Sequence, residues 1–390
     1  MPIMGPSTPA AGDLARLRQH NERVVLAAVR ASGTPRVAQI VADSGLGRTA
    51  VEDVLATLVA RRWLVEERAA IRGRGRPARS YRFRAEAGCA VGLDIGAYSV
   101  RAVLTDLAGR VLATTRRPVS PQTRRRDRLA AADRALADCT RDAGVPERRV
   151  WAVGAGTTGL VDRAGRVVRA NAIPDWAGAD LAGHLGRDGR LVLVDNDSQL
   201  AALAEQRRGV ATEAADLVLL HAGRRTGLAL VLDGRLRRGA YGAAADLSAL
   251  PGLSWEPAIE YLHAVAPADV PVADRAERAF AAARDGDRRA RTAVRRYARA
   301  MALAAATAIA VVDPRMLVLG GAFSQAADVL LEPLGAELAR LCPQVPELRA
   351  STLGADCVAL GAACLALDAV DERLLAADRG PLPALTARSV

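Results

Sequence analysis

Apolar residues recur at helical spacing through the first sixty residues, and two short apolar runs follow. The spacing predicts helices over 13–32, 35–44 and 48–62, and strands over 63–65 and 80–84. Three helices followed by a hairpin is the element order of a winged helix-turn-helix domain, which we expect over residues 13–85. Residues 1–12 are small and include prolines, so we expect them to be disordered.

Beyond Glu86, short apolar runs alternate with helical stretches. Strands are predicted over 90–95, 100–105, 111–115, 150–153, 191–194, 217–221, 227–232 and 316–319. Helices are predicted over 127–143 and 199–207, as one long stretch over 273–312, and again after Gly321. The pattern indicates an α/β body over residues 86–390, built from two halves that each open on a strand, a glycine and a second strand.

Charge is distributed unevenly along the chain. Residues 1–85 contain 15 arginines against 7 acidic residues, a net charge of +8, whereas the whole chain carries +11 and no lysine. A concentrated basic segment is typical of proteins that bind the phosphate backbone of nucleic acids, and a merely soluble cationic surface would spread the excess more evenly. Aromatic residues make up only 3% of the chain, so its core has to be built from alanine, valine and leucine.

The five cysteines are scattered, and nothing at the N-terminus resembles a secretory signal. We therefore predict reduced thiols and a cytoplasmic protein. The most apolar window, Met301–Val312, is too short to cross a bilayer, so no membrane partner is expected.

In a helix-turn-helix domain, the start of the recognition helix faces base edges in the major groove. Here those positions are Arg48, Thr49 and Glu52. A solvated helix face explains each of them alone nearly as well. The loop between the predicted wing strands contains Arg74 and Arg76 in an Arg-Gly-Arg-Pro sequence, which suits insertion into a narrow minor groove. A flexible cationic linker is the alternative for this loop.

Glycine turns of the kind that approach phosphates follow two predicted strands. Asp94-Ile95-Gly96 places a carboxylate at one strand end, and Gly320-Gly321 follows another. Asp195-Asn196-Asp197 follows a third strand. Each motif alone is more often an ordinary turn, but together they indicate a nucleotide or sugar cleft.

These motifs resemble the ROK family (repressors, open reading frames and kinases), particularly its repressor branch. The similar segments are 92–96, 159–162, 195–205, 232–236 and 318–321. The resemblance implies a two-lobed, actin-like ATPase fold of the ribonuclease H type, with a sugar cleft between the lobes. It also implies that Asp197 stands where family kinases have their general base, Asn196 at a sugar contact and Asp94 at the metal and phosphate position.

Other assignments around this cleft stay open. Asn171 and Asp246 are further candidates for hydroxyl contacts with an effector. Asp197 is about as well explained as the N-cap of a helix that starts at Ser198. His184, His221 and His263 are interpreted as surface or strand-end residues rather than ligands.

The chain departs from the kinase pattern in three places. The first phosphate loop continues with Ala97-Tyr98-Ser99, and the second reads Gly223-Arg224-Arg225-Thr226-Gly227. Large side chains thus stand at positions where a phosphate group would need to approach backbone N–H groups directly. The family zinc motif appears as residues 245–249 without its histidine, and the cysteine-rich loop is absent. We therefore predict no metal, no cofactor, no catalytic residue and no kinase activity. The predicted vestigial phosphate-loop residues are Asp94, Gly96, Gly223, Gly227, Gly320 and Gly321.

The leading hypothesis is a transcriptional regulator, a repressor of carbohydrate-related genes. It would bind double-stranded operator DNA as a homodimer or homotetramer and respond to a sugar or sugar-phosphate effector. Two alternatives stay open. One is an ATP-dependent ROK sugar kinase with an appended DNA-binding head, and the other is a constitutive DNA-binding protein with an empty cleft.

Overall fold

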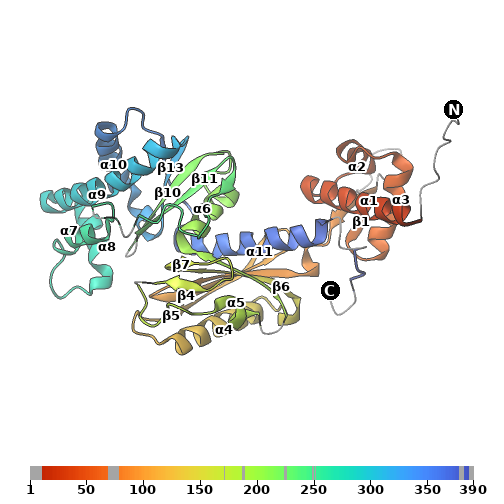
Figure 1. Ribbon diagram of the computed structural model, residues 1–390, viewed down its shortest axis with the longest axis horizontal. Coiled ribbons are helices and arrows are strands. Elements are labelled where there is room, and N and C mark those ends of the chain that lie inside the picture. The colour runs from red at the N-terminus through yellow and green to blue at the C-terminus, as the bar shows by residue number, and fades with distance from the viewer. Residues whose placement is uncertain are drawn as a thin grey trace, which may run out of the picture.

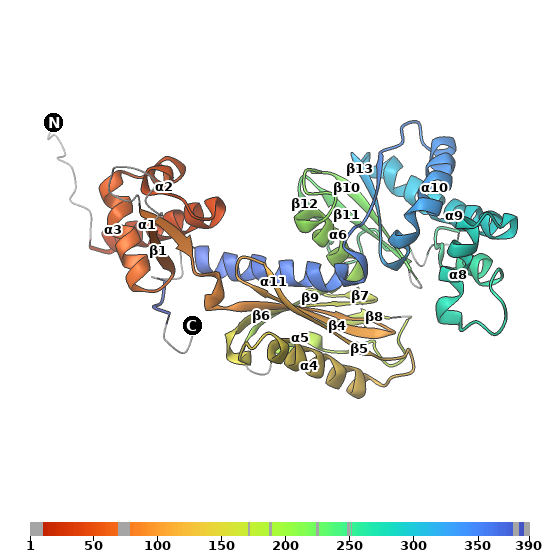
Figure 2. The same ribbon diagram turned by 180° about the vertical axis from the view of Figure 1, so that it is seen from behind.

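The computed structural model describes residues 11–68, 79–170, 172–186, 189–223, 226–247, 250, 252–376 and 382–385. Within these residues the chain forms a small N-terminal body, which we call the head, and two α/β lobes (Figure 1). The lobes lie against each other, and the long helix α11 (Cys357–Leu375) extends from between them toward the head, as the reverse view also shows (Figure 2).

The head contains three helices and one hairpin, in the predicted order. The elements are α1 (Ala11–Ser32), α2 (Val37–Ser44), α3 (Arg48–Ala60), β1 (Leu64–Arg68) and β2 (Arg79–Phe83). The two strands pair antiparallel, with Leu64 opposite Phe83. Gly45, with a φ of 68°, ends α2 in the left-handed conformation that glycine adopts readily, so only three residues separate α2 from α3.

The first lobe is a five-stranded sheet with helices on both faces. Its strands, in sheet order, are β5 (Val111–Pro118), β4 (Ser99–Asp106), β3 (Cys89–Ile95), β6 (Val150–Thr157) and β9 (Leu191–Asn196). Strands β3, β6 and β9 run parallel to one another. Helix α4 (Arg125–Asp142) packs on one face and α11 on the other. The short elements β7 (Leu160–Val161), β8 (Val167–Arg169) and α5 (Leu181–Leu185) complete the lobe.

The second lobe repeats this strand connectivity. Its sheet order is β12 (Arg235–Leu236), β11 (Thr226–Leu232), β10 (Leu217–Ala222), β13 (Met316–Gly320) and β14 (Glu347–Ala350). In each lobe the first strand along the chain is central, the second and third lie on one side, and the fourth and fifth on the other. The remaining helices are α6 (Asp197–Arg208), α7 (Ile259–His263), α8 (Val272–Arg284), α9 (Arg288–Val312) and α10 (Ala327–Leu341). The repeat confirms the predicted body of two similar halves.

The 3-10 turns are η1 (Ala85–Ala87), η2 (Glu147–Arg149), η3 (Glu256–Ala258), η4 (Ala322–Ala326) and η5 (Gly354–Asp356). The single helix predicted over 273–312 is wrong, because it is two helices. Gly286, with a φ of 95°, breaks the chain direction, and the carboxylate of Asp287 then caps α9 by accepting the N–H of Ala290. None of the described helices is long and apolar enough to cross a membrane.

Helix α11 did not stand out in the sequence, because its buried residues surround it rather than form one stripe. Glycines allow its backbone to approach its neighbours closely. A Cβ atom at Gly92 on β3 would lie 1.9 Å from the carbonyl oxygen of Ala359, and one at Gly361 would lie 1.8 Å from that of Leu200 on α6. Backbone contact on two sides fixes α11 between the lobes.

Candidate functional site

A cleft of about 500 Å³ lies between the two lobes. The ends of strands from both sheets and the first turn of α6 meet there, as expected for an open α/β sheet. Of the residues predicted at a ligand or phosphate site, the cleft is lined by Asp94, Gly96, Asn196, Asp197, Gly223, Gly227, Asp246 and Gly321. Gly320 lies at the end of β13 outside this lining, and Asn171 lies outside the described residues.

Two carboxyl groups that line this cleft, those of Asp94 and Asp197, have raised pKa values. Burial, reinforced by the charge of Asp197, raises the pKa of Asp94 to about 7, while Arg101 opposes the shift. Burial also raises the pKa of Asp197 above its ordinary value, and His221 acts in the opposite direction. Two neighbouring carboxyl groups whose pKa values are both raised form an arrangement suited to taking a proton from a bound hydroxyl group.

Asn196, not Asp197, caps helix α6. The side-chain oxygen of Asn196 accepts the N–H groups of Ser198 and Gln199, at 2.9 and 3.3 Å, and its amide nitrogen donates to the carbonyl of Gly159 at 2.9 Å. The interpretation of Asp197 as the N-cap is therefore wrong by one residue. Since the cap is already made, Asp197 stands inside the first turn and lines the cleft.

An ion pair joins the two lobes across the cleft. Arg169 of β8 lies 2.5 Å from the carboxylate of Asp246, which belongs to the segment after β12. Within the second lobe, the amide nitrogen of Gln199 donates to the carbonyl of Gly242 at 3.2 Å, and both residues line the cleft. The other side-chain atom of Gln199, Oε1, is buried without a hydrogen-bond partner among the described residues. A ligand with hydroxyl groups would satisfy this acceptor.

The first glycine loop is held from behind by a buried cation. Arg128, fully buried in α4, donates hydrogen bonds to the carbonyls of Gly96, Ala97 and Ser120 and lies over the ring of Trp176. Burial lowers the pKa of this guanidinium from its ordinary value. Arg224 and Arg225, the bulky residues of the second loop, lie outside the described residues.

Several cleft residues were missed by the sequence analysis. His221, interpreted as a surface or strand-end residue, does lie at the end of β10 but also lines the cleft. Arg101, Arg116 and Arg169 line it as well. Their signal was weak because arginine is spread throughout this chain. Two further histidines considered in the sequence pair elsewhere, His184 with Asp133 and His263 with Glu260.

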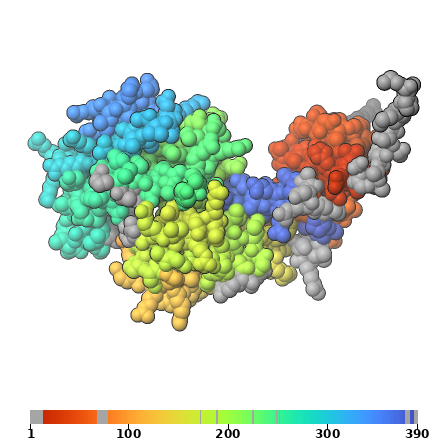
Figure 3. Space-filling view, viewed as in Figure 1, coloured from red at the N-terminus to blue at the C-terminus, as the bar shows by residue number. Residues whose placement is uncertain are grey.

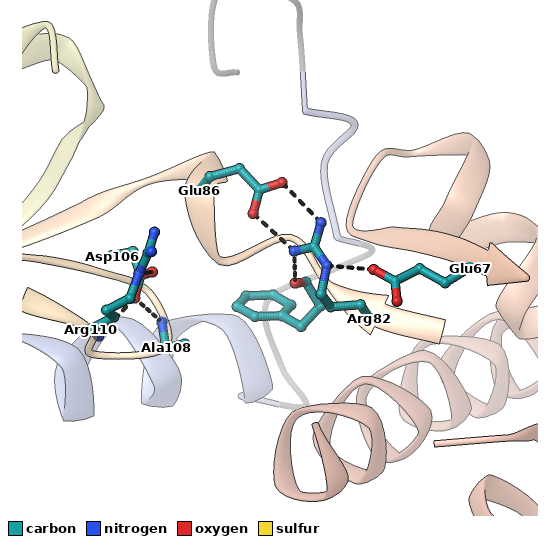
Figure 4. Close-up of polar contacts among 7 residues, drawn as sticks. Glu67, Arg82, Glu86, Asp106, Ala108 and Arg110 are labelled. Atoms are coloured by element: carbon teal, nitrogen blue, oxygen red, sulfur yellow. Dashed lines mark hydrogen bonds and ion pairs between the residues drawn. The ribbon is translucent and has the colours of Figure 1, made fainter. Parts of the chain in front are cut away.

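The structure places Arg48, Thr49 and Glu52 in the first turns of α3, where Arg48 and Thr49 are exposed. Arg48 and Glu52 form an ion pair of 3.0 Å along the helix. Arg74 and Arg76 lie outside the described residues. Behind this surface, Arg82 of β2 binds Glu67 of β1 and Glu86 of the turn that leads into the body (Figure 4).

The described residues do not bring three or more histidine, cysteine, aspartate or glutamate side chains into a group that would hold a metal ion. All five cysteines are buried free thiols. Residues 245–247 and 250 around the former zinc motif therefore do not fit a structural zinc ion of the family type.

Sequence and structure comparisons agree on the family. The ROK family profile matches residues 90–248 and 271–369. The chain belongs to the ROK family. A ROK transcriptional regulator of solved structure, described as a homolog of the Escherichia coli MLC protein, superimposes on 92% of this chain and 98% of its own, with a TM-score of 0.71 and 21% identity. At that identity the likeness shows the fold alone, including the α/β actin-like body.

Other ROK relatives are kinases. A glucokinase of Streptomyces griseus, solved with glucose and AMPPNP, matches 72% of this chain and all of its own, with a TM-score of 0.62 and 26% identity. The glucokinase of Thermotoga maritima is 27% identical over 274 residues, which cover 63% of this chain and 85% of that protein. The match to the glucokinase of Streptomyces coelicolor, 31% identical over 160 residues, covers 41% of this chain and 48% of that protein.

These relatives correct one prediction. The altered loops predicted that the chain is not an enzyme, but that prediction is contradicted, because relatives with similar sequences are named glucokinases. Bulky residues in the two phosphate loops do not by themselves exclude activity, because the carboxylates of Asp94 and Asp197 lie together in the cleft.

Proposed function

We propose that this ROK protein is a DNA-binding transcriptional regulator whose cleft binds a sugar or sugar phosphate. The head would bind operator DNA through α3, two heads of a homodimer would occupy two half-sites, and the cleft would tune that binding. Repression of carbohydrate-related genes is the mode of action that we favour.

The observation that carries this proposal is the surface of α3. Helix α3 follows a short turn at Gly45, which ends α2 in the left-handed conformation. The first turn of α3 exposes Arg48 and Thr49, in an N-terminal segment of high positive charge. Guanidinium groups bind guanine edges or phosphates, and threonine binds phosphates or thymine methyl groups. In this proposal the hairpin of β1 and β2 would act as the wing of a winged helix-turn-helix domain and contact the minor groove.

The cleft supports the sugar part of the proposal. It joins hydroxyl-binding groups of different kinds, namely the carboxylates of Asp94 and Asp197, the amide of Gln199 and the ion-paired Asp246. Arg101 and Arg116 add positive charge that suits a phosphorylated or acidic sugar.

A random-library DNA selection with the purified chain tests the regulator function. We expect recovered duplexes to share a two-fold repeated motif, bound with an affinity that falls steeply as salt rises. Arg48→Ala should relax the preference by roughly 1–3 kcal/mol at one position of each half-site. Failure to bind any duplex at low ionic strength would refute this function.

Sugar phosphorylation is the second candidate, favoured by the pair of raised carboxyl pKa values in the cleft. Asp197 would then take the proton from the sugar hydroxyl, and Mg–ATP would be the second substrate. A coupled ADP-release assay across hexoses and amino sugars tests it, with Asp197→Asn as the control. Sugar-dependent release that this variant abolishes would establish the activity, with or without DNA binding.

A further inference from the structure

Two segments of the chain connect the head to the body, in addition to side-chain contacts between them. The first connection is the chain itself, which passes from β2 through η1 into β3. The second is made by residues 382–385, which we call the C-terminal strap. Its residues Leu382 and Leu385 are only 5% and 7% exposed, and they belong to the same apolar cluster as Leu58 and Trp63 of the head.

The strap binds the residues that directly follow α3. The indole nitrogen of Trp63 donates to the carbonyl of Pro383 at 2.7 Å, and the N–H of Leu385 donates to the carbonyl of Arg61 at 3.0 Å. The guanidinium of Arg61 also donates to the carbonyl of Leu382 at 3.2 Å. Three hydrogen bonds and two buried leucines therefore attach the strap to the end of the proposed DNA-reading helix.

Helix α11, which precedes the strap, begins at the cleft. Its first residues, Cys357 and Val358, line the cleft, and Asp356 just before them pairs with Arg101 at 2.9 Å. Its 19 residues span about 28 Å, because an α-helix rises 1.5 Å per residue. Near its other end, Asp371 pairs with Arg30 of α1 at 2.5 Å, and Val370 enters the apolar cluster of the head.

Helix α6 follows the same route beside α11. It starts with Asp197 in the cleft, and near its end Arg207 pairs with Asp368 of α11 at 2.9 Å. The close backbone contact at Gly361 holds the two helices together. A displacement of the first turns is therefore carried along both helices rather than absorbed by loose side chains.

An apolar cluster continues from the head into the body, where it includes Ala90, Leu107 and Ala152. A second cavity, of about 860 Å³, lies between head and body, lined by residues that include Arg30, Phe83, Leu107 and Leu375. The space-filling view shows the blue end of α11 at this narrow junction (Figure 3). Beside this cavity the ring of Trp63 packs edge-on against that of Trp151, with 6.0 Å between ring centroids, and the guanidinium of Arg30 donates to the carbonyl of Leu107 at 3.2 Å.

We infer that α11 and the C-terminal strap form a mechanical link that transmits the state of the cleft to the end of α3. This inference rests on the proposed function, since it names how the cleft would regulate the head. It assigns the strap a regulatory role beyond filling the core of the head.

Hydrogen exchange on the full chain, without DNA, tests the link. The cleft is perturbed by Arg169→Ala, which removes the ion pair to Asp246 across it. We expect the amides of residues 57–64 to exchange at least threefold faster or slower in this variant than in the unmodified chain. The same comparison in a chain that ends at Ala376 should show no change at these amides.

A second strap variant guards against a head that unfolds when the strap is missing. Leu382→Ala with Leu385→Ala keeps the full length but removes the two apolar anchors, and slow exchange over 25–29 of α1 reports an intact head. Ala384→Ser, at an exposed strap position, is the matched control and should keep the response.

Two outcomes would overturn the inference. In one, Arg169→Ala changes exchange at 57–64 as much without the strap anchors as with them. In the other, the head of the full chain does not respond at all. Because no DNA is present, either result is distinct from a failure to bind duplexes, which bears on the proposed function instead.

Discussion

The cleft and the α3 surface differ in how their residues are held. Asp94 and Asp197 lie at strand and helix ends among groups that shift their pKa values, whereas the side chain of Arg48 is 71% exposed and its one ion pair runs along its own helix. The cleft side chains are thus surrounded by neighbouring groups, whereas the side chain of Arg48 on α3 is mostly in solvent. Substitutions should therefore alter folding strongly around the cleft and weakly on α3.

The largest loss in the free energy of unfolding is expected from Gly361→Val. Its side chain would collide with the backbone of Leu200, so the loss should be about 3 kcal/mol or more in urea unfolding followed by circular dichroism. Gly47→Ala in the head is the matched control, because a Cβ atom there meets nothing within 4 Å, and its loss should stay within about 1 kcal/mol. If both variants lost the same free energy of unfolding, the proposed difference in packing between the two regions would be wrong.

Asp94→Asn should stabilise the protein in a pH-dependent way. The raised pKa of about 7 means that the folded state keeps the proton of Asp94 while the unfolded state loses it near pH 4, so stability falls as pH rises toward 7. The variant should gain about 4 kcal/mol at pH 8 and almost nothing at pH 4, as measured by urea titrations at both values. A gain of the same size at both pH values would contradict this account.

Asn196→Ala should lower stability by about 1 kcal/mol, because α6 loses the side chain that caps it. Asn196→Ser keeps a capping oxygen and loses only the hydrogen bond to Gly159, so its loss should be smaller. Thermal unfolding of the three proteins side by side makes the comparison, and the reverse ranking would show that the link to Gly159 matters more than the cap.

Arg48→Ala is expected to have the smallest effect on folding, less than about 0.5 kcal/mol, because exposed ion pairs along a helix contribute little. Urea unfolding measures this, with Glu52→Ala as the partner variant. A loss above 1 kcal/mol in either would mean that the α3 surface is part of the folded framework, and the contrast with the cleft would fail.

The sequence predicted most elements and the pairing of the lobes, because strand periodicity and glycine turns are local signals. It also selected Asp94, Asn196 and Asp197, which the fold brings into one cleft. It did not indicate α11, since a helix buried all round has no apolar stripe to detect. The strap was equally hidden, because a four-residue segment at 382–385 acquires its meaning only from contacts with Arg61 and Trp63, more than 300 positions away.

The repeated strand order has a consequence for motion between the lobes. Strands β3 and β10 are the central strands of two sheets with the same topology. The C-terminal ends of both strands border the cleft, with Asp94 on one side and His221 on the other. A small molecule bound by both residues would contact two lobes of the same topology, each with its own hydrophobic core. Closing them then needs rotation of two stiff blocks about the helices between them, and neither block has to repack.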